Sequence, residues 1–242
     1  MLTKTQAIVL HTVKYGDSQL IVDMLTRAHG RVAFMQNVSA SGRGKIKKQM
    51  FQPLTLLDLE YDARPKARLQ RIKDVRLLAP YTSIPFDPYK LSLAIFVAEF
   101  LTHATRNEQA NGPLFEFVAT SIQWLDGSGS RFANFHLAFM MRLSLFIGFW
   151  PNTDGAVREG AFFDMRNACF TPTRPSHSDF LWPEDAARLA SMLRMRYENM
   201  HLYKMSRAQR NACVDVILKY YRLHLPDFPD LRSLGVMQEL FA

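Results

Sequence analysis

Apolar and polar residues alternate along the first part of the chain with the period of two that half-buried strands show. In the clearest case, Leu57, Leu59 and Tyr61 share one face of residues 54–61, and the two acidic residues between them share the other. Runs of β-favouring residues separated by turn residues predict four more strands, at 4–15, 19–26, 31–38 and 69–78. We expect a short helical turn at 46–51, between the third and fourth strands.

Five short strands in about eighty residues, with a helical insertion after the third, suit a small closed barrel of the oligonucleotide-binding (OB) type. An open sheet or an SH3-like barrel would fit the same pattern. Three prolines, Pro80, Pro85 and Pro88, then change the character of the chain. We therefore expect an OB domain over residues 1–80 and a second domain over residues 81–242.

The second domain is predicted to be mainly α-helical, with a small irregular or hairpin insertion near 152–182. Asp87 and Pro88 begin a helix that reaches about Thr105 and is apolar nearly all round, as a central, buried helix would be. Ser206 and Gln209 have the spacing of a capping box at the start of another helix. Further helices are expected at 111–125, 131–147, from 183 onward, and at 231–240. The predicted class is α+β.

The distribution of charge indicates what the first domain binds. Of 242 residues, 48% are hydrophobic and 21% charged, as in ordinary globular proteins, and the formal net charge is +8. Residues 1–80 contain 14 lysines and arginines against 6 acidic residues, whereas residues 81–242 contain 16 of each. The whole surplus lies in the first third, which favours a nucleic-acid or anionic-surface function there.

The basic segment Ser39–Lys48 contains two glycines, two serines and no carboxylate, so it favours a long polyanion as its ligand. It lacks the Gly-x-x-x-x-Gly-Lys-Ser/Thr spacing of a phosphate loop, and nucleotide hydrolysis is not supported. The predicted DNA-binding residues come from this segment, the turn after the fourth strand and the fifth strand: Arg43, Lys45, Lys47, Lys48, Arg64, Lys66, Arg68 and Arg71. Three aromatic residues could either stack on bases or fill the barrel core, namely Tyr15, Phe34 and Tyr61.

No spacing of residues indicates catalysis or a metal. The segment Gly127–Gly129 lacks the Gly-x-Ser-x-Gly pattern of hydrolases, and no pair of the Cys-x-x-Cys type is present. We expect no enzyme, no cofactor and no zinc. The two cysteines, Cys169 and Cys213, suit a reducing compartment, and neither a membrane span nor an export signal is visible, so the expected location is the cytoplasm.

A series of short motifs resembles the RecO family of bacterial recombination mediators. In the first eighty residues these are Ala-Ile-Val-Leu-His-Thr (7–12), Tyr-Gly-Asp-Ser (15–18), Thr-Arg-Ala-His-Gly-Arg (26–31), the basic segment and Phe-Gln-Pro-Leu (51–54). Further on, residues 142–151 are similar to the family's Leu-rich helix that ends in Gly-aromatic-x-Pro. Each motif is weak alone, but their order is specific and spans most of the chain.

The resemblance implies an OB barrel followed by a helical domain, with no nucleotide hydrolysis. It implies binding of single- and double-stranded DNA, annealing of complementary strands, and action with RecR to load the RecA recombinase onto strands coated by single-stranded-DNA-binding protein (SSB). It further implies a nucleoid-associated protein of DNA repair, whose helical domain meets the acidic, apolar tail of SSB. Many members carry a four-cysteine zinc site, where this chain has only Cys169 and His177. The hairpin at 162–170 is therefore expected to hold together by packing.

Two other functions fit the residues. One is a metal-dependent nuclease whose carboxylates come together only in the fold. The other is an RNA-binding or RNA-annealing barrel. Covalent change of DNA in the presence of Mg²⁺ would indicate the first, and preference for RNA the second.

Overall fold

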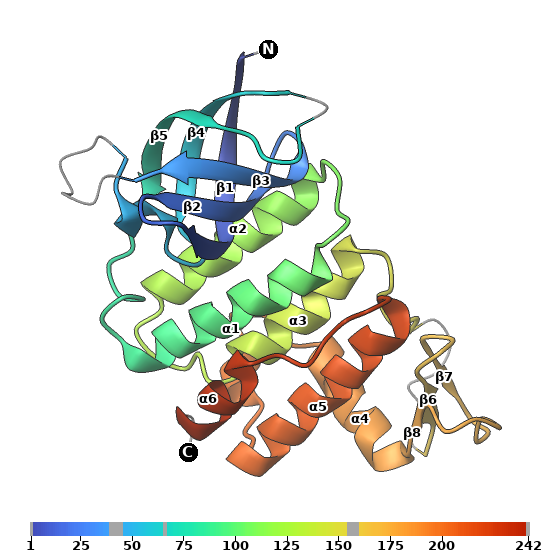
Figure 1. Ribbon diagram of the computed structural model, residues 1–242. Coiled ribbons are helices and arrows are strands. Elements are labelled where there is room, and N and C mark those ends of the chain that lie inside the picture. The colour runs from blue at the N-terminus through green and yellow to red at the C-terminus, as the bar shows by residue number, and fades with distance from the viewer. Residues whose placement is uncertain (1, 39–45, 65–66, 154–159, 241–242) are drawn as a thin grey trace. The chain divides into compact units, whose positions relative to one another are not determined.

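The structure is a computed structural model that describes residues 2–38, 46–64, 67–153 and 160–240. Its contacts divide the chain into two compact units. Unit 1 lies within Met1–Gly127 together with Leu231–Leu240, and unit 2 lies within Ser128–Asp230. The chain has the predicted α+β class, with a five-stranded antiparallel sheet followed by helices (Figure 1). The functional boundary expected at residue 80 stays a prediction.

Unit 1 contains the sheet, a short 3-10 helix and three α-helices. The strands are β1 (Leu2–Tyr15), β2 (Gln19–Thr26), β3 (Gly30–Asn37), β4 (Leu56–Asp62) and β5 (Ile72–Ala79), with the 3-10 helix η1 at Lys48–Phe51. The helices are α1 (Pro88–Ala104), α2 (Gly112–Gly127) and α6 (Ser233–Leu240). All five predicted strands and the helical turn before β4 are present; β5 begins at Ile72 rather than at residue 69.

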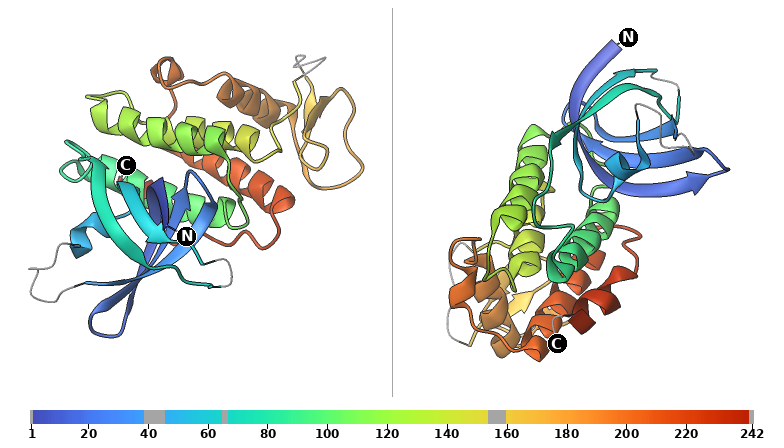
Figure 2. Two further views of the ribbon diagram at one scale, coloured as in Figure 1. Left: turned by 90° about the horizontal axis from the view of Figure 1, so that it is seen from above. Right: turned by 90° about the vertical axis from the view of Figure 1, so that its left-hand side faces the viewer.

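The sheet has the order β3-β2-β1-β4-β5 and is strongly curled (Figure 2). Its two edges meet at a parallel bridge between Phe34 of β3 and Gln70, just before β5. There the Met35 N–H donates to the Gln70 carbonyl and the Gln70 N–H donates to the Ala33 carbonyl, both at 2.9 Å. The sheet is therefore a partly open barrel, compatible with the OB type. The expectation of a closed barrel was wrong: among the described residues, a single bridge at Gln70 joins β3 to the segment before β5, and the ladder does not continue along β5.

The barrel core decides between the two roles considered for the aromatic residues. Phe34 and Tyr61 are buried in the core with Phe51 of η1, and the Phe34 and Tyr61 rings meet edge to face with their centroids 5.1 Å apart. Tyr15, at the end of β1, is 56% exposed. Phe34 and Tyr61 therefore fill the core, and of the three only Tyr15 remains accessible to a ligand.

Part of the outer face of the sheet is covered. Ile8, Leu10 and Leu25 are buried although they lie outside the barrel core, and α1 contacts β1. A bulge in β1 between Val9 and His11 inserts Leu10 as an extra residue. Beyond this bulge, the outer side chains of β1 are exposed.

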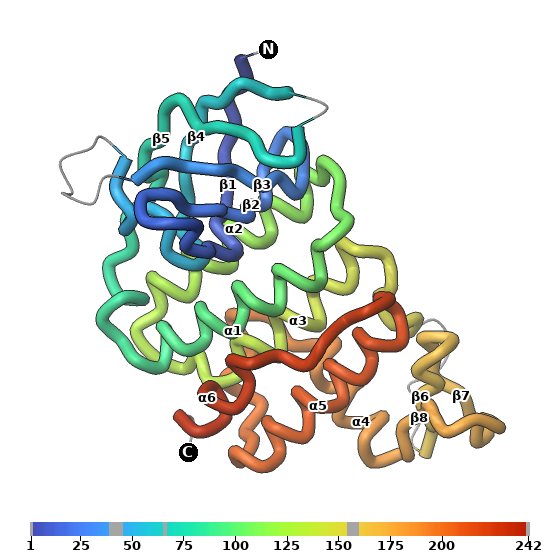
Figure 3. Tube along the Cα trace, viewed as in Figure 1, coloured from blue at the N-terminus to red at the C-terminus, as the bar shows by residue number. Residues whose placement is uncertain are grey.

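Helix α1 begins as predicted, with the Asp87 carboxylate accepting from the N–H groups of Tyr89 and Lys90. Its Glu99 carboxylate accepts from the N–H groups of Arg232 and Ser233, at 2.9 and 2.8 Å, and so holds the start of α6 against α1 (Figure 3). The expectation of a helix buried all round was wrong for one face, since Leu91 and Ile95 are 42% and 45% exposed. An apolar pattern does not say which faces of a helix its neighbours will cover.

The linker between the sheet and α1 is held by one carboxylate, that of Asp126 in α2. It accepts from the N–H groups of Thr82, Ser83 and Ile84 at 2.8–2.9 Å. Burial alone would raise the pKa of Asp126, but these hydrogen bonds outweigh it and lower the pKa to about 2. The linker is thus fastened to α2 by an ionised group throughout the physiological range.

Unit 2 contains α3 (Phe135–Phe146), α4 (Pro183–Leu193), α5 (Arg207–His224), the 3-10 helix η2 (Met200–Leu202) and a small sheet of β6 (Phe162–Asp164), β7 (Cys169–Thr171) and β8 (Phe180–Leu181). The capping box of Ser206 and Gln209 is confirmed. The predicted hairpin is β6 and β7, while β8 and η2 were not predicted. Helix α3 begins at Phe135, four residues later than the pattern indicated. None of the helices among the described residues combines the length and apolar character that crossing a membrane requires.

Candidate nucleic-acid interface

The uncovered part of the outer sheet face carries a row of three apolar side chains. Val13 of β1 pairs with Ile21 of β2, and Ile21 pairs with Met35 of β3. These side chains point away from the core, because their neighbours Leu20, Val22 and Phe34 point into it. Val13 is 46% exposed. We call Val13, Ile21 and Met35 the outer row; Tyr15, two residues after Val13, stands beside it.

The predicted basic residues lie at the two ends of the same region of the sheet. In register, Thr12 faces Val22, Val22 faces Phe34, and Phe34 meets Gln70. At one end the Thr12 hydroxyl donates to the Phe51 carbonyl of η1, the helix that begins at Lys48. At the other end Arg71 follows Gln70 directly, and Arg68 precedes it by two residues. Three strand spacings separate the ends, about 14 Å at most, which suits a few nucleotides of the 4–16 that an OB fold holds.

Gln70 also shapes the turn that carries the second basic group. Its side-chain amide donates to the carbonyls of Arg64 and Ala67, at 2.9 and 3.0 Å, and its side-chain oxygen accepts from the Arg64 N–H at 2.9 Å. Since its backbone is bonded to β3 at the same time, Gln70 places Arg64, Arg68 and Arg71 beside the middle of that strand. Sequence reasoning missed this role, because only the fold shows which strand a turn glutamine reaches.

Five of the eight predicted DNA-binding residues lie in the described part of the chain. Lys47, Lys48, Arg64, Arg68 and Arg71 are all exposed. Arg64 is also within 3.8 Å of the Asp62 carboxylate, a weak and solvated pair. The other three, Arg43, Lys45 and Lys66, lie outside the described residues.

Several other cations of residues 1–80 hold the fold together. Arg27 pairs with Glu116 of α2 at 2.7 Å. The Arg31 guanidinium donates to the Thr102 carbonyl at 2.9 Å and the Thr105 hydroxyl at 3.2 Å, at the end of α1. Burial lowers the pKa of Arg31, an effect that the Asp23 carboxylate opposes. These two arginines join the sheet to the helices.

The outer face of β4 and β5 differs from the outer row in charge. A shallow groove there is lined by three carboxylates and two cations, and ion pairs join Lys4 to Glu60 at 3.5 Å and Arg76 to Asp74 at 3.6 Å. Because the three carboxylates of this groove outnumber its two cations, the face is nearly balanced in charge with a slight negative excess, and it is a poor surface for a polyanion. The accessible positive groups of unit 1 thus favour the outer row.

A further basic group comes from α1 and was missed in the sequence. His103 and Arg106 lie at or just after the end of α1, and Arg31 joins that end to β3. Burial lowers the pKa of His103; Glu99 opposes this, while Arg106, Arg31 and His11 of β1 lower it further. Arg106 and Arg31 therefore lie near His103 and His11 where the end of α1 meets the sheet. More than ninety residues separate His11 from His103, so no local pattern could have indicated it.

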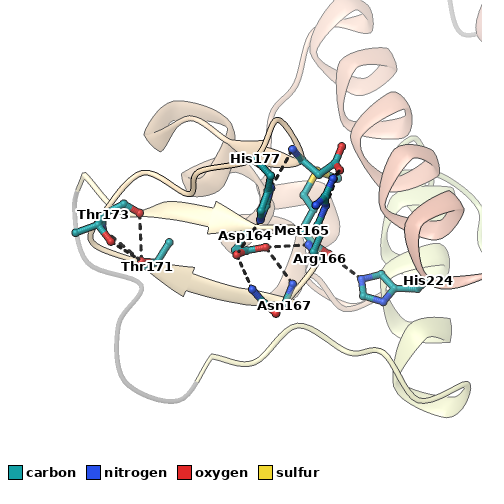
Figure 4. Close-up of polar contacts among 9 residues, drawn as sticks. Asp164, Met165, Arg166, Asn167, Thr171, Thr173, His177 and His224 are labelled. Atoms are coloured by element: carbon teal, nitrogen blue, oxygen red, sulfur yellow. Dashed lines mark hydrogen bonds and ion pairs between the residues drawn. The ribbon is translucent and has the colours of Figure 1, made fainter.

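The described residues contain no group of three or more histidine, cysteine or acidic side chains placed to hold a metal ion. In unit 2, where the sequence left Cys169 and His177, a hydrogen-bond network centres on Asp164 instead (Figure 4). Its carboxylate accepts from the N–H groups of Arg166 and Asn167, from the Asn167 amide, and from His177 Nε2. His177 Nδ1 accepts from the Asp179 N–H at 3.2 Å, which assigns the ring proton to Nε2.

Comparison with known protein families and relatives agrees with this arrangement. The family model described as "Recombination protein O N terminal" matches residues 1–81, and "Recombination protein O C terminal" matches residues 85–234. Proteins named "DNA repair protein RecO" are 51% identical over 242 residues in Phocaeicola vulgatus and 50% identical over 242 residues in Bacteroides fragilis, with all of both chains covered. One from Flavobacterium psychrophilum is 30% identical over 243 residues, again over all of both chains. The chain belongs to the RecO family of DNA repair and recombination proteins.

Proposed function

We propose that this chain is a non-enzymatic recombination mediator that binds single- and double-stranded DNA and anneals complementary strands. With RecR it helps RecA load onto SSB-coated single strands, in the cytoplasm at the nucleoid. Residues 1–80 are the DNA-binding domain, and residues 81–242 bind protein partners. The observation that carries the proposal is the uncovered outer row, with exposed cations at both ends: Lys47, Lys48, Arg64, Arg68 and Arg71. The proposal also assigns DNA binding to Arg43, Lys45 and Lys66, which lie outside the described residues.

The mechanism follows from the chemistry of this surface. Lysines and arginines bind phosphates of any sequence and release counterions, so affinity falls steeply with salt. Tyr15 and the outer row offer apolar surface to the sugars and bases of a bound strand. Annealing follows if the cations neutralise two strands at once while the base edges stay free to pair.

The test removes two of the cations and compares the salt dependence of binding. We expect Lys47→Gln with Lys48→Gln to weaken binding to single strands of any sequence. The slope of log affinity against log salt should fall by about 1.4, at about 0.7 for each lost phosphate contact. Lys4→Gln with Arg76→Gln removes the same charge from the balanced face of β4 and β5 and should change the slope little. An unchanged slope in the first variant, or equal losses in both, would contradict the proposal.

A second assay separates the functions that the sequence left open. Labelled complementary strands coated with SSB are mixed with the protein, with and without RecR, in the presence of Mg²⁺. Faster annealing without covalent change is the expected result. Cleavage would identify a nuclease, and stronger binding and faster annealing of RNA would identify an RNA-annealing protein.

A further inference from the structure

The small sheet of unit 2 exposes a cluster of aromatic rings. Phe163 of β6 pairs with Leu181 of β8, and both are buried, so the alternate residues Phe162 and Phe180 point to the other face. Trp182 follows directly and is 53% exposed. The ring centroids of Phe162, Phe180 and Trp182 lie 5.4–5.9 Å from one another. We call these three residues the aromatic face.

One arginine lies over this face. The Arg174 guanidinium carbon is 5.3 Å from the centroid of the Phe180 ring and 5.1 Å from that of Trp182. The loop that carries Arg174 is stiffened by the neighbouring Pro172 and Pro175 and by a hydrogen-bonded turn between Thr171 and Thr173. Arg174 is therefore held in place by stacking and leaves its N–H groups available at the surface.

The other arginines nearby are engaged with carboxylates. Arg166 pairs with Asp179 at 2.7 Å, and Arg188 pairs with Asp185 at 3.1 Å and with Glu184. Among the described residues, no carboxylate pairs with Arg174.

Two acidic groups in the described part of this subdomain likewise have partners. Asp179 also receives Lys219 at 3.7 Å, and Asp164 accepts the donors of the network in Figure 4. Burial would raise the pKa of Asp164, but hydrogen bonds from Asn167 and His177 outweigh it and keep the carboxyl ionised. Arg166, Arg188 and Lys219 are thus paired with carboxylates, whereas Arg174 is exposed and stacks on aromatic rings.

We propose that the aromatic face and Arg174 form a second contact for single-stranded nucleic acid, with a base stacked on Trp182 and its phosphate on the Arg174 guanidinium. The exposed indole of Trp182, with the partly buried Phe162 and Phe180 rings beside it, can stack on any base, and a guanidinium held over the rings adds both stacking and a phosphate partner. An aliphatic partner helix would need a groove of branched side chains, which this flat aromatic and cationic surface does not provide. The inference rests on the proposed function. It adds a second site at which the protein contacts single-stranded nucleic acid, in a part of the chain whose net charge is zero.

The test uses the full-length protein and an unstructured oligonucleotide. We expect Trp182→Ala to weaken binding to oligo-dT about tenfold, which corresponds to one lost stacked base, and to leave duplex binding unchanged. The loss should persist at high salt, where phosphate contacts weaken. Trp182→Phe, which keeps an aromatic ring, should retain most of the affinity, and Arg174→Ala should lose part of it. Oligo-dT should quench tryptophan fluorescence in the wild type and much less in Trp182→Ala.

Two matched controls lie in the same unit. Leu202→Ala removes an exposed apolar side chain, and Arg194→Ala removes an exposed cation at the far end of α4, about 18 Å along the helix from Trp182. Both should bind oligo-dT as the wild type does.

If Trp182→Ala binds oligo-dT and shows fluorescence quenching as the wild type does, while Lys47→Gln with Lys48→Gln still weakens binding, the aromatic-face proposal is overturned and the proposed function is not. A Trp182→Ala protein that binds DNA normally but loses RecR or SSB would overturn it in favour of a protein contact. A wild type that binds no oligonucleotide would overturn both proposals.

Discussion

Gly30 shows how one residue can set the junction between the sheet and the helices. It has a φ of +64°, and an added Cβ would lie 2.3 Å from the Glu108 carbonyl oxygen, which accepts a hydrogen bond from the Arg31 N–H. The close atoms are backbone, so no side-chain rotation can make room. Gly30 is therefore required both by its backbone conformation and by the contact that it allows.

We expect Gly30→Ala to lower the free energy of unfolding by more than about 2 kcal/mol, the left-handed strain plus the displacement of the segment around Glu108. Gly16→Ala is a matched control, because Gly16 has the same φ of +64° and open space around it. It should cost only about 1 kcal/mol. Urea unfolding of both variants measures the difference, and equal losses would refute the steric part of the argument.

Among the elements, the small sheet of unit 2 is held by Asp164 and by aromatic packing. Four donors converge on this buried carboxylate, and Phe163 on the inner face packs against Phe170 with the ring centroids 4.9 Å apart. The packing expected from the sequence is therefore joined by a polar centre that sequence reasoning did not predict. This centre lies in the segment where the resemblance placed a zinc site in other members.

We expect Asp164→Ala to lower the free energy of unfolding by about 3 kcal/mol, because its partly buried donors lose their acceptor. A chelator should leave the melting temperature of the wild type unchanged. Asp230→Ala is the control, since Asp230 is 97% exposed and pairs with Arg222, and it should cost little. A melting temperature lowered by the chelator, or an Asp164→Ala protein as stable as the wild type, would contradict this account.

Elements with strong local signals could be predicted from the sequence. The alternation around Leu59, the cap at Asp87 and the capping box at Ser206 each act within a few residues, and each appears in the structure. Strand β8 has only two residues, Phe180 and Leu181, and exists because it pairs with β6. A two-residue strand is too short to show the alternation of apolar and polar residues, so its formation depends on pairing with a segment that is distant in the sequence.

Local patterns in the sequence likewise indicated only part of the candidate sites. The basic residues were visible because charge is a property of each residue, and their clustering near 39–48 and 64–71 is local. The outer row requires the register of three strands and the bulge at Leu10, which changes which side chains of β1 face outward. The stacking of Arg174 on Trp182 crosses a loop and a strand end, so the sequence showed the two residues without the contact.

For the whole molecule, surplus charge and accessible charge are different quantities. The first eighty residues carry the entire net positive charge of +8, yet Arg27 and Arg31 are engaged in contacts that join the sheet to the helices. Residues 81–242 sum to zero, yet they present Arg106 beside the sheet and Arg174 on the aromatic face. Net charge per domain favours polyanion binding by the first eighty residues, and the pairing of each cation indicates which cations are accessible to such a ligand.

The stability of the whole chain should depend on pH through a histidine outside either proposed binding surface. His136 in α3 is 3% exposed, and burial, with a further contribution from Arg210, lowers its pKa to about 3. In the unfolded chain its pKa is about 6.5. Between these values the unfolded state binds a proton that the folded state does not, so stability rises with pH in this range. The stabilisation is complete above about pH 6.5 and is lost progressively as the pH falls toward 3.

We therefore expect the melting temperature of the wild type to fall on acidification from about pH 7.5 to pH 4.5 more steeply than that of His136→Leu, which has no proton to take up. Comparing the two slopes, rather than the two melting temperatures at one pH, removes the packing cost of the substitution. His201→Gln, at a partly exposed histidine of the same unit, is the control and should follow the wild type. Parallel pH profiles for wild type and His136→Leu would show that His136 carries no proton-linked stability. Asp126 does not affect this comparison, because its contribution to stability is lost only as the pH falls from about 3.8 toward 2, below the range tested.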